Sequence, residues 1–524
     1  MKMVKSLLLG TAAGLVAVAG AQAADMPVKA KPIQYVKICS LYGDGFYYIP
    51  GTDVCLKIGG YVRAEYSYGF SSSSMTNGPF SAAGLGNITT RTDGQDWMMR
   101  TRAYVWEDSR QQTEYGTLRT YFQLGVNFDN PTTSATGFNA NRAFIQFAGF
   151  TIGLAQSFYD FYSSPASSYW APPSSDTGDP GWKVFAYTAQ FGNGVSATVS
   201  VEESRSFGTA APIGGVVNTD FGNVFLLNGT QIAADRAKQR FPDLVSNWRI
   251  DQAWGSAQIM FAAHDVSAGY YGPGSSAFSP DAICAPAAVS GGTPVGTEIC
   301  GHPADKVGWA AGLGAKFNTF GGSYFQFQVN YTQGANRYAA FTAPNASNMI
   351  SRFNGAELGY GIYTDGVYST ITGDVQLTTA WGVNAAYDHF WRPDLRTSLY
   401  GSYLAVRYND VANFAICSTQ VGVSPPGGGI SFNAPGTTGF GLPVGTGCNN
   451  NFNIWTVGSR TQWNITPWFY VGFDVFYQKL QSASDGSIVK YTAVSPIAKP
   501  TALYSISDQD DVAFRVRVHR DIIP

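Results

Sequence analysis

The chain has 524 residues, of which 45% are hydrophobic and 13% charged, and its mean hydropathy is −0.07. This composition is too polar for a helical membrane protein, and beyond the N-terminus no run of about eighteen apolar residues predicts a membrane helix. The 33 basic and 35 acidic residues give a net charge of −2, which argues against a nucleic acid as partner.

The N-terminus has the pattern of a secretory signal peptide. Lys2 and Lys5 form a basic segment, residues 7–19 are apolar, and Ala21-Gln22-Ala23 is a small-residue cleavage site. We therefore expect residues 1–23 to be removed on export. Loss of the two lysines lowers the basic residues from 33 to 31 against 35 acidic residues, a net charge of about −4.

From residue 55 to the C-terminus, about sixteen segments of roughly ten residues alternate between apolar and polar side chains. In 118–127, for example, Leu118 and Phe122 alternate with Arg119 and Gln123. Soluble β-sandwiches also alternate. In a membrane β-barrel, every second residue faces lipid and its neighbours face an aqueous lumen.

The connections favour the barrel over the sandwich. Long stretches near 71–95, 129–140, 158–181, 203–242, 265–305, 332–378, 409–451 and 482–510 alternate with short turns. This is the pattern of short periplasmic turns and long extracellular loops. The long stretches are rich in Gly, Ser, Pro and Asn and need no core of their own, although 367–377 could form an extra hairpin strand.

We therefore predict an all-β fold: a transmembrane antiparallel β-barrel of about 16 strands over 55–524, preceded by a periplasmic segment over 24–54. Such a barrel is wide enough for a water-filled channel. Eleven of the twelve tryptophans lie in or next to expected strands, where we predict an aromatic girdle at the membrane surface. Trp106 is one of these, and Trp170, in the third long loop, is the exception.

The first part of the mature chain suggests a family. Val36-Lys37-Ile38-Cys39-Ser40-Leu41-Tyr42-Gly43, Gly45-Phe46-Tyr47-Tyr48-Ile49-Pro50-Gly51-Thr52-Asp53 and Cys55-Leu56-Lys57-Ile58-Gly59-Gly60-Tyr61-Val62-Arg63 resemble the start of alphaproteobacterial porins, the general outer-membrane porins of rhizobia and brucellae. The resemblance is specific over about 25–68 and looser over the rest. One departure is the C-terminus: barrels of this type commonly end in an aromatic residue, and this chain ends Ile522-Ile523-Pro524.

The resemblance implies a sixteen-stranded homotrimer in the outer membrane of a Gram-negative bacterium, in contact with lipid and lipopolysaccharide. It also implies passive diffusion of ions and small hydrophilic solutes, with the third long loop folded into the barrel. That loop has no Lys or Arg, and its acids are Asp160, Asp176 and Asp179. We expect them to form a pore constriction.

Opposite these acids we expect a basic wall. Seven arginines have the parity of lumen-facing residues on adjacent strands of a closed barrel: Arg63, Arg100, Arg102, Arg119, Arg142, Arg515 and Arg517. Arg stays charged at any working pH, so this arrangement predicts a transverse field that orients dipolar solutes and filters ions. Some of these arginines could instead reach toward headgroups from strand ends.

The six cysteines fall into three local pairs, and an even count in an exported protein favours disulfides. The predicted pairs are Cys39 with Cys55, Cys284 with Cys300, and Cys417 with Cys448. A metal site at Cys284, Cys300 and His302 is an alternative that lacks an evident fourth ligand. A calcium site at Asp508, Asp510 and Asp511 is another, with a solvated acidic loop as the simpler interpretation.

No enzyme motif is present: there is no Gly-x-Ser-x-Gly, His-Glu-x-x-His or phosphate-binding glycine loop, so we predict no enzyme and no cofactor. The main hypothesis is an outer-membrane porin. Lumen-facing Tyr104, Tyr121 and Phe144 keep a solute-specific channel open as an alternative. A surface receptor or adhesin built from the long loops is a third hypothesis.

Overall fold

The computed structural model describes residues 38–69, 97–129, 137–170, 172–178, 181–205, 215–219, 240–269, 271, 301–340, 349–369, 372–420, 430–432, 448–491 and 502–523. The expected signal peptide and residues 24–37 lie outside them. Within these ranges, no helix has both the length and the apolar character needed to cross a membrane.

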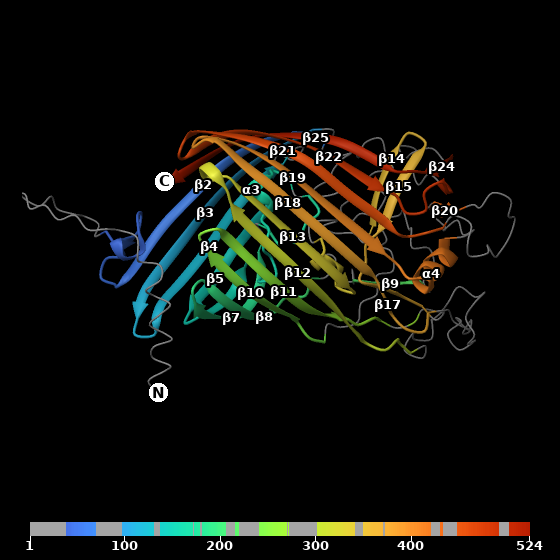
Figure 1. Cartoon of the computed structure of the whole chain (residues 1–524), viewed down its shortest axis with the longest axis horizontal. Helices are drawn as coiled ribbons and strands as arrows, with labels where there is room; N and C mark the ends of the chain where they lie inside the picture. The colour runs from blue at the N-terminus through green and yellow to red at the C-terminus, as the bar shows by residue number, and fades with distance from the viewer. Residues whose placement is uncertain are drawn as a thin grey trace, which may run out of the picture.

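Sixteen antiparallel strands form a closed barrel (Figure 1), which confirms the predicted architecture. The ring closes where β25 pairs with β2, with Ala64 opposite Val518 and Glu65 opposite Arg517. The strands are β2 (Val54–Tyr68), β3 (Trp97–Thr113), β4 (Gly116–Asp129), β5 (Gly137–Phe147), β6 (Phe150–Ala155), β7 (Trp182–Gly192), β8 (Val195–Glu202), β10 (Asp243–Gln252), β11 (Gly255–Val266), β12 (Lys306–Asn318), β13 (Tyr324–Gln333), β18 (Thr379–Arg392), β19 (Leu395–Arg407), β21 (Phe452–Thr466), β22 (Phe469–Gln481) and β25. Strand β25 spans Gln509–Ile523.

Side chains alternate between the two faces of the wall. In β2, Val62 and Tyr66 are exposed on the outside, whereas Glu65 and Ser67 are buried on the inside. The strands therefore present an apolar exterior to lipid. Eight tryptophans are exposed: Trp97, Trp248, Trp254, Trp309, Trp381, Trp391, Trp463 and Trp468.

Trp106 corrects the predicted girdle. It has the same parity in β3 as buried Tyr104 and Asp108, and its ring lies over Gly59 and stacks near Tyr121 on the inner wall. It therefore lines the lumen and does not contact lipid.

Tight turns gather at one end of the barrel, the end that carries the C-terminus at the left of Figure 1. The turn between β7 and β8 shows why its sequence is Asn-Gly: Asn193 and Gly194 both have positive φ, 50° and 73°. A Cβ at Gly194 would lie 1.9 Å from the backbone oxygen of Asp251, so the close approach of β10 also requires glycine.

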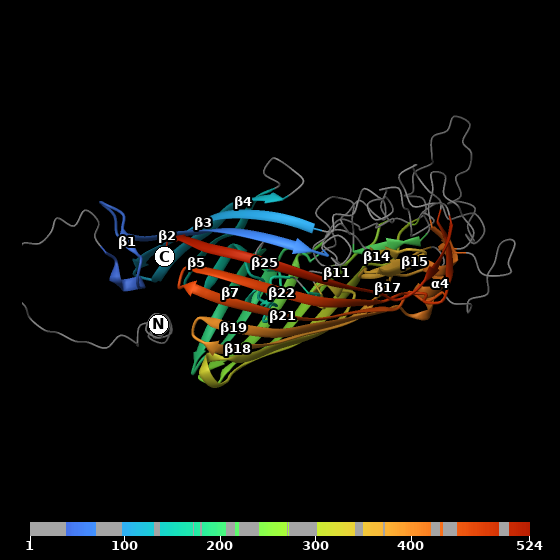
Figure 2. The same cartoon turned by 90° about the horizontal axis from the view of Figure 1, so that it is seen from above.

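The opposite end carries folded loops, as Figure 2 shows from above. One small sheet contains β14 (Met349–Asn354), β15 (Glu357–Ile362), β20 (Ile430–Phe432), β23 (Ile488–Tyr491) and β24 (Ala502–Ile506). Another contains β9 (Val216–Asn218), β16 (Gly366–Tyr368) and β17 (Gln376–Leu377). The antiparallel pairing of β16 with β17 confirms the extra strand pair suggested within 367–377. Helix α4 (Asp410–Gln420) lies beside them.

The expectation that these loops need no core is wrong. Tyr360, Tyr363 and Ile416 from the loops form a buried cluster with Leu404 and Ile454 from the barrel strands. The loops therefore bury enough apolar surface to hold their own structure at this end of the barrel.

Two of the three predicted disulfides are present. Cys39–Cys55 ties the segment containing η1 (Ser40–Tyr42) and β1 (Tyr47–Tyr48) to β2, and Cys417–Cys448 links α4 to the start of the segment before β21. Cys284 lies outside the described residues, so its pairing with Cys300 stays a prediction. The remaining short helices are α3 (Ser164–Ser167), η5 (Phe320–Gly322) and η6 (Asn336–Tyr338).

Candidate constriction of the lumen

The third loop, between β6 and β7, begins with an anchor on the neighbouring wall. The hydroxyl of Ser157 donates a hydrogen bond to Glu202 at the end of β8 (2.5 Å), and the backbone N–H of Phe158 donates to the same carboxylate (2.9 Å). The carbonyl of Phe158 accepts a hydrogen bond from Asn247 of β10 (2.5 Å). These three hydrogen bonds fix the point at which the loop leaves the wall, beside β8 and β10.

The loop then reaches the far side of the barrel. Ser167 of α3 donates to Asp388 of β18 (2.5 Å), and the backbone N–H of Tyr169 donates to Asp474 of β22 (2.5 Å). Arg460 of β21 donates to the carbonyl of Ala166 (2.6 Å). Because these strands lie opposite β6 and β7 in the ring, the third loop crosses the lumen, as predicted.

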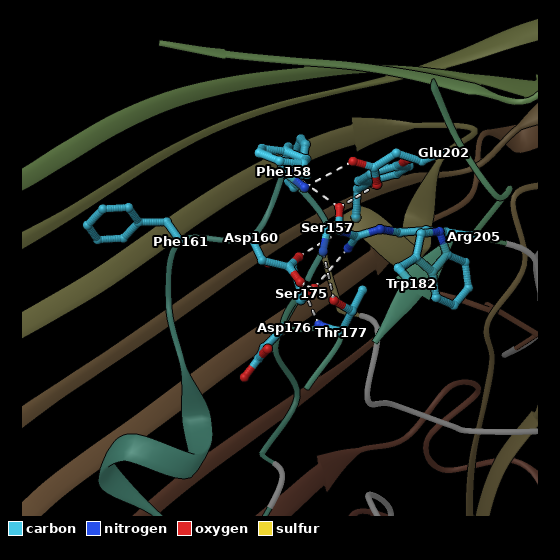
Figure 3. A network of polar contacts seen from close by, with 12 residues as sticks. Ser157, Phe158, Asp160, Phe161, Ser175, Asp176, Thr177, Trp182, Glu202 and Arg205 are labelled. Carbon is cyan, nitrogen blue, oxygen red and sulfur yellow. Dashed lines mark hydrogen bonds and ion pairs between the residues drawn. The ribbon is translucent and has the colours of Figure 1, made fainter. Parts of the chain in front are cut away.

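A buried arginine holds the loop at its origin (Figure 3). Arg205, just after β8, forms an ion pair with Asp160 (2.6 Å) and also donates to Ser157 (2.6 Å) and to the carbonyl of Ser175 (2.8 Å). Asp160 in turn accepts hydrogen bonds from both the backbone and the hydroxyl of Thr177. The outgoing and returning arms of the loop are thus joined through one guanidinium.

The predicted acids of the loop are placed as follows. Asp160 and Asp176 are 6% and 3% exposed, so both lie inside the packed loop. Asp176 accepts hydrogen bonds from the backbone N–H groups of Ser164 (3.0 Å) and Gly178 (2.7 Å). Asp179 lies outside the described residues.

The seven predicted arginines lie on the inner face of their strands, and three of them contact the loop. The guanidinium of Arg517 lies 3.9 Å from the ring centroid of Tyr169. Arg515 donates to the carbonyl of Tyr169 (2.6 Å), and Arg142 donates to the carbonyl of Gly178 (2.8 Å). The structure therefore brings the arginines to the backbone of the loop, and it gives Asp160 a partner, Arg205, from outside this group.

Arg517 and the four arginines that do not contact the loop have partners on the wall itself. Arg517 pairs with Glu65, which lies 3.7 Å from Arg63 as well. The remaining contacts are Arg100 with Asp129, Arg102 with Asn127 and Arg119 with Asp108. Local acids thus offset part of the positive charge of this wall.

Several residues of the constriction were not predicted from the sequence. Glu65 and Asp108 share lumen-facing parity with the arginines, so alternation alone could have identified them. Asp388, Asp474 and Arg460 are also inward residues of long strands. Arg205 gave no such signal, because it follows β8 in an irregular segment.

Beside the loop, the lumen contains a cavity of about 410 Å³. Its lining includes Arg142, Ser196, Thr198, Gln258 and the loop residue Phe158. The lining includes hydroxyl, amide and guanidinium groups, which can replace part of the hydration of a polar solute.

Residues 25–513 match a sequence profile whose family is described as a porin subfamily. The chain belongs to this porin family. It is 32% identical over 221 residues to Porin Omp2a of Brucella ovis, covering 38% of this chain and 59% of that protein. It is 29% identical over 274 residues to Porin Omp2b of Brucella suis, covering 50% of this chain and 67% of that one. The matches thus span 59% and 67% of the lengths of these two relatives.

Among solved structures, the porin is similar to the outer membrane channel DcaP of Acinetobacter baumannii, with a TM-score of 0.51 and 12% identity over 91% of this chain and 99% of that chain. This likeness supports the fold. Membership of the porin family places the chain in the outer membrane of a Gram-negative bacterium.

Within the described residues of this porin, no three His, Cys, Asp or Glu side chains are grouped as metal ligands. The acids of 508–511 have other partners: Asp508 pairs with Lys479 (3.2 Å), Asp510 accepts from Tyr477 (2.9 Å), and Asp511 lies 3.5 Å from Arg352. Cys284 lies outside these residues, so the alternative site at Cys284, Cys300 and His302 is untested.

Proposed function

We propose that this porin forms a water-filled channel for passive diffusion of ions and small hydrophilic molecules across the outer membrane. The observation that carries the proposal is the third loop, which is fastened to both sides of a closed sixteen-strand barrel and narrows its lumen. A barrel of this size leaves an aqueous channel that side chains alone do not fill.

The test is single-channel conductance of the purified, folded chain in a planar bilayer with KCl on both sides. Large ohmic steps are expected. Absence of conductance from a chain that is folded and inserted would contradict a diffusion channel.

We also propose a homotrimer, because members of the resembled family assemble in threes. Each bilayer insertion should then close in three equal steps at high voltage, and native mass spectrometry should give three times the mass of the chain. Closure in a single step, with the mass of one chain, would contradict it.

The charged groups of the constriction should set the ion selectivity. We expect Asp160, Asp176 and Asp179 to oppose the fields of Arg142 and Arg515, which contact the same loop. Neutralising the three acids to Asn should shift the reversal potential in a KCl gradient toward anion preference. Asp394→Asn, in an exposed turn, is the matched control, and an unchanged permeability ratio in the triple variant would contradict the assignment.

A solute-specific channel is the second candidate, because aromatic rings line the inner wall next to arginines. Tyr121 stacks on Phe144 (5.4 Å between centroids), and the guanidinium of Arg119 lies 5.4 Å from both rings. Tyr104 stacks on Tyr61 (5.3 Å). Saturable inhibition of KCl conductance by one solute would favour this candidate over general diffusion.

A further inference from the structure

A second cavity lies at the tight-turn end of the barrel, away from the third loop. The segment 38–53 folds back on β2, where β1 pairs with Cys55 and Leu56 and the Cys39–Cys55 disulfide holds it. Between this segment and strands β2 to β4 is a space of about 430 Å³, within the range of small-molecule sites. Its lining includes Tyr42, Phe46, Lys57, Trp106, Arg110 and Tyr121.

One side of the cavity is a flat aromatic surface. A Cβ at Gly59 would lie 2.0 Å from the ring of Trp106, so the indole lies directly on the backbone of β2. Tyr121 continues this surface, with its ring centroid 6.2 Å away and an angle of 20° between the planes, and Phe144 follows at 5.4 Å. Because Gly59 has no side chain, one face of the indole packs on the backbone of β2, and the other face is turned toward the cavity.

Positive groups and two further rings form the other side. The guanidinium of Arg110 lies 4.9 Å from the ring centroid of Phe46 and 5.6 Å from that of Tyr42. The ammonium of Lys57 lies 5.9 Å from the Phe46 ring and donates to the backbone oxygen of Asp44 (3.0 Å). Among the described residues, Lys57 has no carboxylate partner.

The distribution of charge at the cavity leaves Lys57 available to an anion. Both oxygens of Asp108 accept hydrogen bonds from two guanidiniums, those of Arg110 and Arg119, at 2.8 to 3.0 Å. The lining holds two cations, Lys57 and Arg110, and two carboxylates, Asp44 and Asp108. Asp108 is already shared by Arg110 and by Arg119, which is not part of the lining. A carboxylate entering the cavity would meet Lys57 without competing with Asp108 for its arginines.

A polar atom in the lining also lacks a partner. The hydroxyl of Tyr42 is buried and has no hydrogen-bond partner among the described residues. A buried hydroxyl left unsatisfied has an unfavourable free energy, which a ligand oxygen would remove.

We propose that this cavity binds small carboxylates that carry a flat ring, with the ring stacked on Trp106 and Tyr121 and the carboxylate at Lys57. The site would hold such solutes at the periplasmic mouth, so this role rests on the proposed channel function. The disulfide-closed segment 38–53 supplies half of the site and is therefore needed for binding.

The test is isothermal titration of the purified full-length porin with benzoate at neutral pH, with KCl conductance measured on the same preparation. Saturable binding of about one benzoate per chain is expected. Trp106→Ala and Lys57→Met should each weaken it about tenfold, the effect expected for loss of one ring or charge contact. Trp106→Phe, which keeps a ring, should retain most of the affinity.

Lys316→Met is the matched control, because Lys316 also lies near an aromatic ring on the inner wall, 4.2 Å from the centroid of Tyr324. The Lys316→Met variant should bind benzoate with the same affinity as the unaltered chain. The site would be overturned if the Trp106→Ala and Lys57→Met variants bound benzoate as tightly as the unaltered chain.

Two further probes separate the ring from the charge. Acetate and benzyl alcohol should each bind about tenfold more weakly than benzoate, because each makes only one of the two contacts. Acetate that binds as tightly as benzoate would overturn the ring component. Benzoate binding without KCl conductance would support the site and refute the channel, whereas conductance without binding would refute the site alone.

Discussion

Arg205 joins more parts of the constriction than any of the arginines predicted from strand parity. Its side chain is buried, and it contacts Asp160, Ser157 and the carbonyl of Ser175. Its guanidinium also lies 4.3 Å from the ring of Tyr338 in η6, so the third loop and the loops at the far end are linked through it. One residue therefore connects the origin of the third loop to the loops at the far end of the barrel.

Arg205→Met should release the origin of the third loop. Removing one partner of a buried ion pair leaves the other charge uncompensated, which typically costs about 3–5 kcal/mol. We expect larger and noisier single-channel conductance, together with a lower unfolding midpoint.

The double variant Arg205→Met/Asp160→Asn should recover part of the normal conductance and part of the unfolding midpoint, because it leaves no unpaired charge in the buried pair. Arg392→Met is the control: its pair with Asp394 is exposed and should contribute no more than about 1 kcal/mol. Wild-type conductance and stability in Arg205→Met would contradict this role.

For single residues, the sequence predicts best which side chains of a strand face the lumen, because inward and outward residues alternate. Alternation correctly placed Tyr104 and Tyr121 inside, and the same rule applied to Trp106 would have removed it from the predicted girdle. Arg205 could not be found in this way, because its partner Asp160 is 45 residues away and both lie in loops. Contacts between loops have no periodic signal in the sequence.

Among the elements, the segment 38–53 depends most on a covalent bond. It contains only the short η1 and β1, and its small core is Cys39, Phe46 and Cys55 with Tyr42 and Tyr48 packed against them. Such a core is too small to hold the segment by packing alone. The disulfide was predictable from the position of the two cysteines, whereas the cavity beneath the segment was not.

Replacing both Cys39 and Cys55 by Ser should free this segment while the barrel remains folded. On the chain-entropy model, a disulfide with a sequence separation of 16 contributes about 3 kcal/mol. Limited proteolysis should then cut within 38–53 in the variant and not in the oxidised protein. The pair Cys417→Ser/Cys448→Ser is the control, since it should leave this segment protected. Equal protection in both variants would show that packing suffices.

The third loop was predicted as an element from its place after the fifth strand and from the family resemblance. Its course across the lumen depends on Asp388, Asp474 and Arg460, which lie more than 200 residues further along the chain. The folded loops at the far end were missed for a similar reason. Their apolar residues are separated by long polar stretches and come together only in three dimensions.

For the molecule as a whole, the exterior must match lipid and the interior water. Val199 in the middle of β8 is 66% exposed on the outer face, whereas Ser196 of the same strand lines the cavity beside the third loop. The strands could be counted from the sequence because this requirement makes each of them alternate between apolar and polar residues. The closure itself follows from the need to satisfy every backbone group in the membrane.

Val199→Arg should destabilise the folded barrel in lipid by about 2–4 kcal/mol, the cost of a charged side chain near the bilayer midplane. Ser196→Arg, three residues earlier and facing water, should change stability little and reduce conductance instead. Urea unfolding in lipid vesicles measures the first effect, and bilayer recording measures the second. A similar loss of stability in both variants would contradict the assigned faces.

The seam between β2 and β25 has a consequence for how the chain folds. Tyr68 lies opposite Phe514, so the pairing that completes the ring joins residues separated by almost the entire sequence. Contacts of such long separation form slowly, because most of the chain must first be ordered between them. Until they form, β2 and β25 each present an open edge with unpaired backbone groups. Any shortening that removes either strand would therefore leave the last step of assembly without a partner, however complete the other strands are.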